Sequence, residues 1–425
     1  MELTVERPAH GGHCIARHDG RVVFVRHGLP GERVRARFTA ADDGASYWRA
    51  DVTEVLEPSV HRVAHPWREA DALYAHHSGS QPVGGAEFGH IALAEQRVLK
   101  AAIFAEQLRR LAKIDREVVV EAAPGESADG LGWRTRVGFA VDAQGKLAMH
   151  VHRSENLVRV RMMPLAVQAV NALGLAELDL SGLSKVDVAA GVGEPLVLLT
   201  PAARTSAKRV AAIAGSITGA SVSVHDPESG AVRRIKGRTW VQEENPPHSY
   251  RVTGAGFWQI HREAPAVLTA AVLAGLDVQS GESVADLYAG AGLFTAPLAA
   301  AVGAGGTVVS VEGSPGASRD ARRNLHGYPH VGIVQGRVDA VLGARDTRFD
   351  AILLDPPRAG AGRKTVELIS RAASRLVGYV SCDPASFARD LALFSEQGWS
   401  MESLRVFDLY PHTHHMESFA VLRRC

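Results

Sequence analysis

The sequence predicts a three-part α/β protein whose C-terminal part is a doubly wound, Rossmann-like parallel sheet with an antiparallel last strand. We expect an OB-like β-barrel over residues 1–61, an α+β domain over 62–245 and the doubly wound domain over 246–425. The first segment is dense in short alternating strands and tight turns, and the second mixes a long helix with antiparallel strands. From about residue 282, strands and helices alternate, which is typical of a parallel sheet.

Charge and cysteine content narrow the classes of protein to which the chain could belong. Lys and Arg number 47 and Asp and Glu 46, so the chain as a whole is not a polybasic binder, although a local basic face could still contact RNA. Three scattered cysteines, Cys14, Cys382 and Cys425, argue against a disulfide scaffold and favour a reducing compartment. The N-terminus is charged, and no apolar run reaches about 18 residues. We therefore expect a cytoplasmic monomer that contacts no membrane.

The barrel prediction rests on residues 14–41, which alternate apolar and polar side chains and turn at Asp19-Gly20 and at Leu29–Gly31. Residues 48–58 supply one more strand. Short strands with tight turns are typical of a small OB-type barrel. Arginines recur through this segment, which suits RNA contact, but a solvated strand face with interspersed acids explains them equally well.

The middle of the chain predicts a mixed domain. Residues 91–114 have apolar side chains at helical spacing and no breaker. Residues 132–160 alternate and turn at Gln144-Gly145, as antiparallel strands do, and residues 186–240 continue in that style.

The C-terminal part contains five predicted parallel strands, separated by helical stretches, over residues 284–289, 307–312, 331–336, 349–357 and 376–382. Residues 403–424 then hold two strands with no helix between them, which predicts an antiparallel pair at one edge of the sheet.

A nucleotide-type cofactor site is predicted where the first of these strands ends. Gly290 and Gly292 allow close backbone approach at a helix N-terminus, and Glu312, at the end of the second strand, can accept hydrogen bonds from two ribose hydroxyls. A dinucleotide fingerprint would place a third glycine at Thr295. Together with the Asp-Pro-Pro motif described next, the pattern fits S-adenosylmethionine better than a nicotinamide.

Two neighbouring strands deliver an acid and a thiol to the same edge of the sheet. Asp355 stands before two prolines that end its strand, and Cys382 ends the next strand. Arg358 follows where an amino-group methyltransferase has an aromatic residue. Cys382 could be a small core residue. Its place at the strand exit instead favours a nucleophile that adds to carbon 6 of uracil and makes carbon 5 nucleophilic. Glu417, at the start of the last strand, is the candidate base that removes the carbon 5 proton.

The turn before Glu417 holds His412, His414 and His415. Zinc sites recruit further ligands from a second locus, and no cysteine pair lies nearby. We expect a structural turn and no metal.

Six motifs together resemble the RNA uracil-C5 methyltransferases that carry an N-terminal TRAM domain, and the resemblance covers essentially the whole chain. They lie at residues 11–34, 237–261, 286–295, 353–360, 381–384 and 411–418. The resemblance implies a class I methyltransferase fold and an RNA-binding barrel. It also implies Cys382 as nucleophile, Glu417 as base, and cofactor or substrate contacts at Gln259, Tyr288, Glu312 and Asp355.

Departures from the family pattern change two expectations. His261 and Leu293 stand where family members often have Asn, which leaves those cofactor contacts open. Many members bind an iron–sulfur cluster through four cysteines, including a Cys-Gly-Gly-Cys stretch. Here Gly84-Gly85 remain but Ala86 replaces a cysteine, and no cysteine occurs between residues 15 and 381. We therefore expect no iron–sulfur cluster, because its thiolate ligands are missing.

The leading interpretation is methylation of uridine at carbon 5 in 23S ribosomal RNA, with the T-loop of tRNA as the alternative substrate. An RNA cytosine-C5 methyltransferase would place a cysteine after a proline at the end of the fourth strand, where this chain has Pro356-Pro357. A catalytically idle RNA-binding protein on the same fold is a third possibility, against which the intact Cys382, Asp355 and Glu417 argue.

Overall fold

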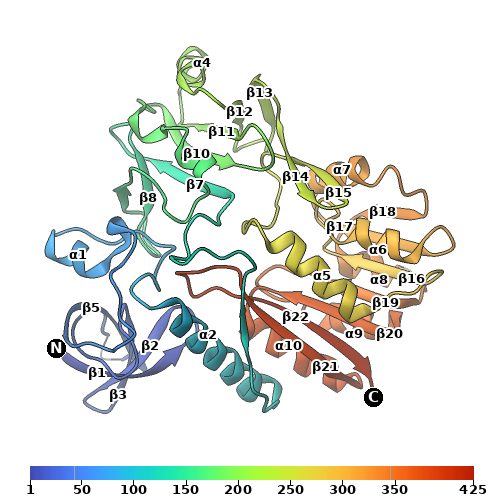
Figure 1. Ribbon diagram of the computed structural model, residues 1–425, viewed down its shortest axis with the longest axis horizontal. Helices are drawn as coiled ribbons and strands as arrows, with labels where there is room; N and C mark the ends of the chain where they lie inside the picture. Colours follow the sequence, from blue (N-terminus) through green and yellow to red (C-terminus); the bar gives the residue numbers. More distant parts are fainter. Residues whose placement is uncertain (43, 345) are drawn as a thin grey trace.

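The computed structural model describes residues 1–42, 44–344 and 346–425. Figure 1 shows the N-terminal barrel, the central sheet and the C-terminal α/β sheet as three adjoining parts, with the chain ends on opposite sides of the molecule. Within the described ranges, no helix is both long and apolar enough to cross a bilayer.

The first five strands close into a barrel in the order β1-β2-β3-β5-β4. Their bounds are β1 Glu2–Ala9, β2 His13–His18, β3 Arg21–Arg26, β4 Arg33–Ala40 and β5 Tyr47–Glu57. Alternate residues such as Val5, Val23 and Val52 point inward and are almost fully buried. The predicted OB-like barrel is confirmed.

A buried ion pair fixes the chain where it leaves the barrel. The carboxylate of Glu32, which has no exposed surface, accepts hydrogen bonds from Arg62 Nε at 2.6 Å and Nη2 at 2.7 Å. The chain then forms a 3-10 turn at Arg68–Ala70 and helix α1, Ala72–His77. Asp71 caps α1 by accepting the Leu73 N–H at 2.9 Å.

The central sheet has seven strands in the order β13-β12-β11-β10-β7-β8-β9. The strand bounds are β7 Arg136–Val141, β8 Leu147–His150, β9 Leu157–Arg159, β10 Leu183–Ala189, β11 Leu196–Pro201, β12 Ser221–His225 and β13 Val232–Lys236. Helices α3 (Gln168–Asn171) and α4 (Ala207–Ser216) and a 3-10 turn at Leu175–Glu177 accompany it. A separate hairpin, β14 Trp240–Asn245 and β15 His248–Thr253, leads into the C-terminal part.

The C-terminal sheet has eight strands in the order β18-β17-β16-β19-β20-β22-β21-β6. Its strands are β6 Val120–Ala122, β16 Ser283–Leu287, β17 Thr307–Glu312, β18 Val331–Gln335, β19 Phe349–Leu354, β20 Ala373–Ser381, β21 Trp399–Asp408 and β22 Glu417–Arg424. Its helices are α5 Ala264–Leu276, α6 Thr295–Val302, α7 Pro315–Asn324, α8 Val338–Gly343, α9 Arg363–Ala372 and α10 Pro384–Glu396. β16 to β20 run parallel, whereas β22 runs antiparallel to both its neighbours. The predicted doubly wound sheet with an antiparallel last strand is confirmed.

The sheet edge differs from the expectation. β6, Val120–Ala122, pairs in parallel with β21 and covers the antiparallel pair, so β6 forms that edge of the sheet. The predicted long helix is α2, Leu93–Gln107, which continues as a π-helical turn over Leu108–Ala112. Phe104 of α2 packs on Phe387 of α10, with ring centroids 5.5 Å apart. Both α2 and β6 therefore pack with the C-terminal sheet, although they precede the central sheet in the chain.

Candidate active site

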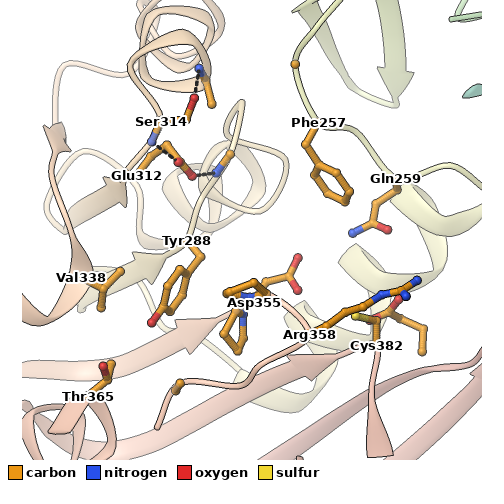
Figure 2. A pocket seen from close by; sticks show the side chains of 18 of the residues that line it. Phe257, Gln259, Tyr288, Glu312, Ser314, Val338, Asp355, Arg358, Thr365 and Cys382 are labelled. Carbon is orange, nitrogen blue, oxygen red and sulfur yellow. Dashed lines mark hydrogen bonds between the residues drawn. The ribbon is translucent and has the colours of Figure 1, made fainter. Parts of the chain in front are cut away.

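A large cleft of about 1270 Å³ lies where β16, β17, β19 and β20 end, at the edge of open α/β sheets where ligands bind. Seven of the eight predicted site residues line it: Gln259, Tyr288, Gly290, Glu312, Asp355, Cys382 and Glu417. Figure 2 shows Glu312 and Tyr288 at one end of the cleft and Cys382 at the other, with Asp355 between them. The predicted cofactor residues and the predicted nucleophile therefore line the same cleft.

Gly292 is the exception, because it is buried and does not line the cleft. Its φ of +94° is a conformation that favours glycine, and a Cβ there would lie 3.0 Å from Leu325 Cδ1. This packing and the hydrogen bond from the Gly292 N–H to the Ala289 carbonyl at 2.9 Å account for glycine here through the turn, and its contact with a cofactor stays a prediction. Gly290, whose φ is +58°, does face the cleft.

Glu312 holds the glycine turn through its side chain. One carboxylate oxygen accepts the Gly290 N–H at 2.9 Å, and the other accepts the Ser314 N–H at 2.5 Å. Each oxygen has a second lone pair, so the carboxylate can also accept hydrogen bonds from two hydroxyls of a ligand. The geometry fits a ribose, and the cleft beside it has room for an adenosyl group.

Tyr288 joins the end of β16 to the glycine turn in a left-handed conformation, with φ at +63°. Left-handed backbone is costly for a bulky residue and clusters at ligand sites. Asp286, two residues earlier, has no exposed surface, and its Oδ2 accepts a hydrogen bond from Thr295 Oγ1 at 2.5 Å. Burial raises the pKa of Asp286 to about 7.

Asp355 occupies the middle of the cleft, at the end of β19. Burial, and then the nearby charge of Asp286, raises its pKa to about 7. A carboxyl with this pKa exists in both protonation states near neutral pH. Asp355 can therefore accept or donate a hydrogen bond toward a bound ligand.

Cys382 ends β20 and immediately precedes α10, whose N-terminus is capped by Asp383. Burial, followed by the charges of Glu417 and Asp355, raises the pKa of the thiol to about 12, and Arg358 opposes that shift. The free protein therefore carries a neutral thiol at this position. Arg358 and the dipole of α10 are the local features that favour a thiolate.

Glu417 begins β22 and is only 2 % exposed. Its Oε2 accepts a hydrogen bond from the hydroxyl of Tyr410 at 2.9 Å. Burial and the charge of Asp355 raise the pKa of Glu417 well above its usual range, while Tyr410 and Arg358 oppose the rise. A raised carboxyl pKa close to a partly buried thiol is typical of acid–base sites.

Sequence reasoning missed three residues that line the cleft. Tyr410 contacts Glu417, Phe257 is 66 % exposed, and Arg134 reaches the cleft from the segment before β7. Arg134 is partly buried and forms no ion pair with any described carboxylate; its Nε–H donates to the Arg136 carbonyl at 2.9 Å. An arginine without an ion pair can donate hydrogen bonds to a ligand oxygen. Phe257 lies two residues before Gln259 in the motif at residues 237–261, and this position was a signal that sequence reasoning could have used.

A second pocket of about 450 Å³ reaches Cys382 from the barrel side. The barrel contributes His13, Phe24, Tyr47 and Arg49, and the loop after β8 contributes Arg153. The rings of Phe24 and Tyr47 are 5.1 Å apart, edge to face. Burial, and then the charges of neighbouring groups that include Arg26, Arg153 and Arg49, lower the pKa of His13 to about 4. The pocket is thus aromatic, positively charged and continuous with the nucleophile.

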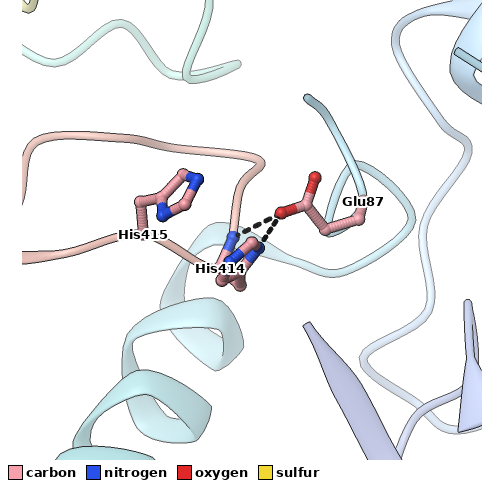
Figure 3. A group of neighbouring side chains, drawn as sticks. All are labelled: Glu87, His414 and His415. Atoms are coloured by element: carbon pink, nitrogen blue, oxygen red, sulfur yellow. Dashed lines mark hydrogen bonds and ion pairs between the residues drawn. The ribbon is translucent and has the colours of Figure 1, made fainter. Parts of the chain in front are cut away.

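The three histidines of the predicted turn separate into two groups. His412 is buried, and its backbone N–H donates to Gln96 Oε1 at 2.8 Å. His414 contacts Glu87, and the ligand atoms of Glu87, His414 and His415 lie within 4.8 Å of one another (Figure 3). Arg358 Nη2 donates to His415 Nε2 at 3.4 Å. Burial and neighbouring cations lower the pKa of His415 to about 3, so its ring is neutral. Glu87, His414 and His415 could together hold a metal ion by their geometry, so the absence of a metal here stays a prediction.

Neither of the two residues that depart from the family pattern, His261 and Leu293, lines the cleft. His261 is buried outside the cleft and stacks on Trp133, with ring centroids 5.5 Å apart. Leu293 is buried, and its carbonyl accepts the Tyr250 hydroxyl at 3.0 Å. Gly85 lines the cleft, whereas Ala86 is packed in the core.

Three family models match parts of the chain. Residues 338–425 match the family model described as tRNA (uracil-5-)-methyltransferase, and residues 1–52 match the TRAM domain. Residues 225–356 match a model of protein-L-isoaspartate(D-aspartate) O-methyltransferase.

Full-length relatives agree with the match to an RNA methyltransferase. An uncharacterized RNA methyltransferase of Streptomyces avermitilis is 42 % identical over 99 % of this chain and 97 % of its own length. The 23S rRNA (uracil(1939)-C(5))-methyltransferase RlmD of Hahella chejuensis is 28 % identical over 100 % of this chain and 97 % of its own. Among solved structures, the Pyrococcus abyssi tRNA (uracil-54, C5)-methyltransferase, in complex with S-adenosyl-L-homocysteine, has the same fold. Its TM-score is 0.74, at 19 % identity, with 99 % of each chain covered.

Proposed function

The chain belongs to the RNA uracil-C5 methyltransferases with an N-terminal TRAM domain, and we propose that it makes 5-methyluridine in 23S ribosomal RNA, with Cys382 as nucleophile and Glu417 as base. The enzyme depends on S-adenosylmethionine. One observation carries the assignment of residues: a thiol and a buried carboxyl, from two antiparallel neighbouring strands, line the same cleft as the glycine turn.

Two roles follow from the chemistry of uracil. Deprotonated Cys382 forms a bond to carbon 6, and the electron pair of the 5,6 double bond moves toward the carbonyl at carbon 4. Carbon 5 thereby becomes nucleophilic. After carbon 5 has been methylated, the Glu417 carboxylate takes its proton. The released electron pair restores the double bond and expels the Cys382 thiolate.

The cofactor half of the cleft has residues suited to S-adenosylmethionine. Glu312 would accept the ribose hydroxyls, and the turn at Gly290 leaves open space where a side chain would otherwise intrude. When bound, the cofactor supplies an electrophilic methyl group. Gln259, which is buried at the junction of the two halves, has an amide that can fix the donor and the base relative to each other.

The other half suits a uracil taken out of a base stack. Arg134 and Arg358 can donate hydrogen bonds to carbonyl oxygens, and donors aimed at the carbonyl at carbon 4 would stabilise its developing negative charge. Phe257 offers an exposed aromatic face at the rim for a splayed base. The second pocket would take a neighbouring nucleotide, because aromatic rings and arginines are the usual platform for single-stranded RNA.

Ribosomal RNA is the proposed substrate because full-length relatives from two bacteria, at 28 % identity, are 23S rRNA methyltransferases. The family model and the similar fold are named for tRNA enzymes, so tRNA is the alternative. Methyl transfer to unmodified 23S rRNA fragments and to tRNA transcripts, followed by nucleoside mass spectrometry, separates the two. Transfer to tRNA alone would reject the ribosomal substrate.

The mechanism is tested with the same RNA on a denaturing gel. The Glu417→Gln variant should accumulate a covalent, methylated protein–RNA adduct, because thiolate addition and methylation precede the missing step. Wild-type protein should form a similar adduct with 5-fluorouridine RNA, since fluorine does not leave as a proton does. Cys382→Ala should form none. An adduct mapped to Cys14 or Cys425, or an active Cys382→Ala variant, would overturn the assignment.

The same experiment addresses the two other functions. A catalytically idle RNA-binding protein would form no adduct with either substrate. A cytosine-C5 methyltransferase would form its adduct with 5-fluorocytidine RNA and yield 5-methylcytidine instead.

A further inference from the structure

We propose that Tyr410 is a positioning residue that aims the carboxylate of Glu417 at the carbon 5 proton and favours its charged form, an inference that rests on the proposed role of Glu417. The hydroxyl of Tyr410 lies 2.9 Å from Glu417 Oε2, and both side chains line the catalytic cleft together with Cys382. Sequence reasoning assigned Tyr410 no role.

The contact leaves the two oxygens of the base in different states. Oε2 accepts the phenol hydrogen, whereas Oε1 receives no hydrogen bond from any residue within the described ranges. A carboxylate anchored through one oxygen cannot rotate freely, so the other oxygen keeps a fixed direction. Such preorganisation is what proton abstraction from a bound carbon requires.

Tyr410 is itself held from several sides. Its backbone carbonyl accepts hydrogen bonds from Lys100 Nζ at 3.1 Å and from Thr413 Oγ1 at 2.8 Å. Its ring meets Trp133 edge to face, with centroids 6.0 Å apart, and meets His415 in the same way at 6.1 Å. A donor fixed at both its backbone and its ring can impose its position on the carboxylate that it contacts.

The electrostatic surroundings explain why the base needs this donor. The groups that act on Glu417 are Asp355 at the end of β19, Arg358 in the following loop, Cys382 at the end of β20 and Tyr410 itself. Burial and Asp355 raise the pKa of Glu417 well above its usual range, and both Tyr410 and Arg358 lower it. A phenol that donates to the charged form therefore increases the fraction of ionised base at a given pH.

The test follows adduct formation and adduct breakdown separately by rapid-quench single turnover across a range of pH. Tyr410→Phe keeps the ring and removes the donor. The rate of adduct breakdown should rise with pH as Glu417 ionises, and we call this part of the pH profile its rising limb. Because the donor lowers the pKa of Glu417, its loss should move the rising limb to higher pH by about one to two units. Breakdown near neutral pH should slow by about ten- to a hundredfold. Adduct formation, cofactor affinity and the KM for RNA should stay near wild type.

A matched control makes the same chemical change elsewhere. Tyr379 donates from its buried hydroxyl to Asp390 Oδ2 at 2.7 Å, outside the cleft. Tyr379→Phe should leave the position of the limb unchanged. If Tyr410→Phe leaves the limb unmoved, or slows formation and breakdown equally, Tyr410 has only a packing role and the proposal fails.

A second variant covers the case in which Tyr410→Phe folds poorly. A fluorinated tyrosine at position 410 is a stronger donor in nearly the same volume, and it should move the limb to lower pH. A limb that stays in place would overturn the proposal. Failure of the proposed function is distinguishable, because Glu417→Gln would then accumulate no adduct, whatever the variants at Tyr410 do.

Discussion

Lys100 Nζ lies 2.5 Å from Asp408 Oδ1, and neither side chain has any exposed surface. The pair joins α2, which precedes the central sheet, to the end of β21, from which the chain continues to Tyr410 and Glu417. The same ammonium also donates to the Tyr410 carbonyl at 3.1 Å. One buried cation thus ties the segment between the barrel and the central sheet to the loop that leads to the candidate base.

Replacing Lys100 with Met should destabilise the fold, because it leaves the buried carboxylate of Asp408 with only the longer contact to Arg97 Nε at 3.6 Å. Breaking one partner of a buried pair costs about 3–5 kcal/mol. The exposed pair between Arg405 and Glu121 serves as the control, since such pairs contribute about 0–1 kcal/mol. Urea unfolding of Lys100→Met and Arg405→Ala measures the difference. Equal losses would contradict the importance of the buried pair.

The cofactor prediction concerns Glu312. Exchanging its carboxylate for an amide in Glu312→Gln removes a charged acceptor and replaces one of the two oxygens that hold Gly290 and Ser314. The affinity for S-adenosylmethionine should fall by about 1–3 kcal/mol. Calorimetry measures this, with Glu402→Gln as a control on an exposed acid far along the chain. Wild-type affinity in a folded Glu312→Gln protein would reject the ribose contact.

The prediction that the protein holds no iron–sulfur cluster follows from its cysteine content. Protein purified anaerobically should be colourless and contain no stoichiometric iron or sulfide, because no thiolate lies between residues 15 and 381. Elemental analysis checks this. Iron and sulfide at one cluster per chain would contradict it.

The features that the sequence predicted follow from local patterns, whereas those that it did not predict depend on short elements or on the tertiary fold. The parallel strands and the residues at their exits, such as Asp355 and Cys382, follow from local periodicity and from the rule that such strands share one ligand-binding edge. β6 contains three residues and is therefore too short for any periodicity to reveal it. Arg134 and Tyr410 lie in irregular segments, and only the tertiary fold brings them to the cleft.

Gly292 shows that a sequence motif alone does not separate residues with different surroundings. Glycines at 290 and 292 look equivalent as letters, and both adopt positive φ. Only the structure distinguishes them, because Gly292 packs against Leu325 and Gly290 faces the cleft.

The thiol prediction uses the pKa of about 12 for Cys382. Each pH unit below a thiol's pKa reduces the thiolate fraction about tenfold, so Cys382 should react slowly with iodoacetamide near pH 8 in the absence of RNA. Its rate should keep rising with pH through pH 10, since the pKa lies above that range. The exposed Cys425 supplies the internal reference, read by peptide mass spectrometry. Rapid labelling of Cys382 near pH 8 would show that the free enzyme already holds a thiolate.

The last prediction concerns the pocket between the barrel and Cys382. Arg49 and Arg153 line it without an ion pair to any described acid, so they are free to meet phosphate, and Tyr47 is 41 % exposed beside them. Arg49→Ala should weaken RNA binding and reduce the slope of log affinity against log salt by about one, because one phosphate contact is lost.

Tyr47→Ala should instead weaken binding without changing that slope, since base stacking releases no counterion, and should cost about 1–3 kcal/mol. Arg423→Ala removes the same charge from an arginine paired with Glu402 at 3.0 Å and should change neither quantity. Filter binding across a salt series, with cofactor affinity measured in parallel, separates these effects. Because the pocket and the catalytic cleft share Cys382 and Arg358, a nucleotide held there would lie next to the target base. If Arg49→Ala and Arg423→Ala gave the same slope as wild type, the RNA would have to reach Cys382 by another route.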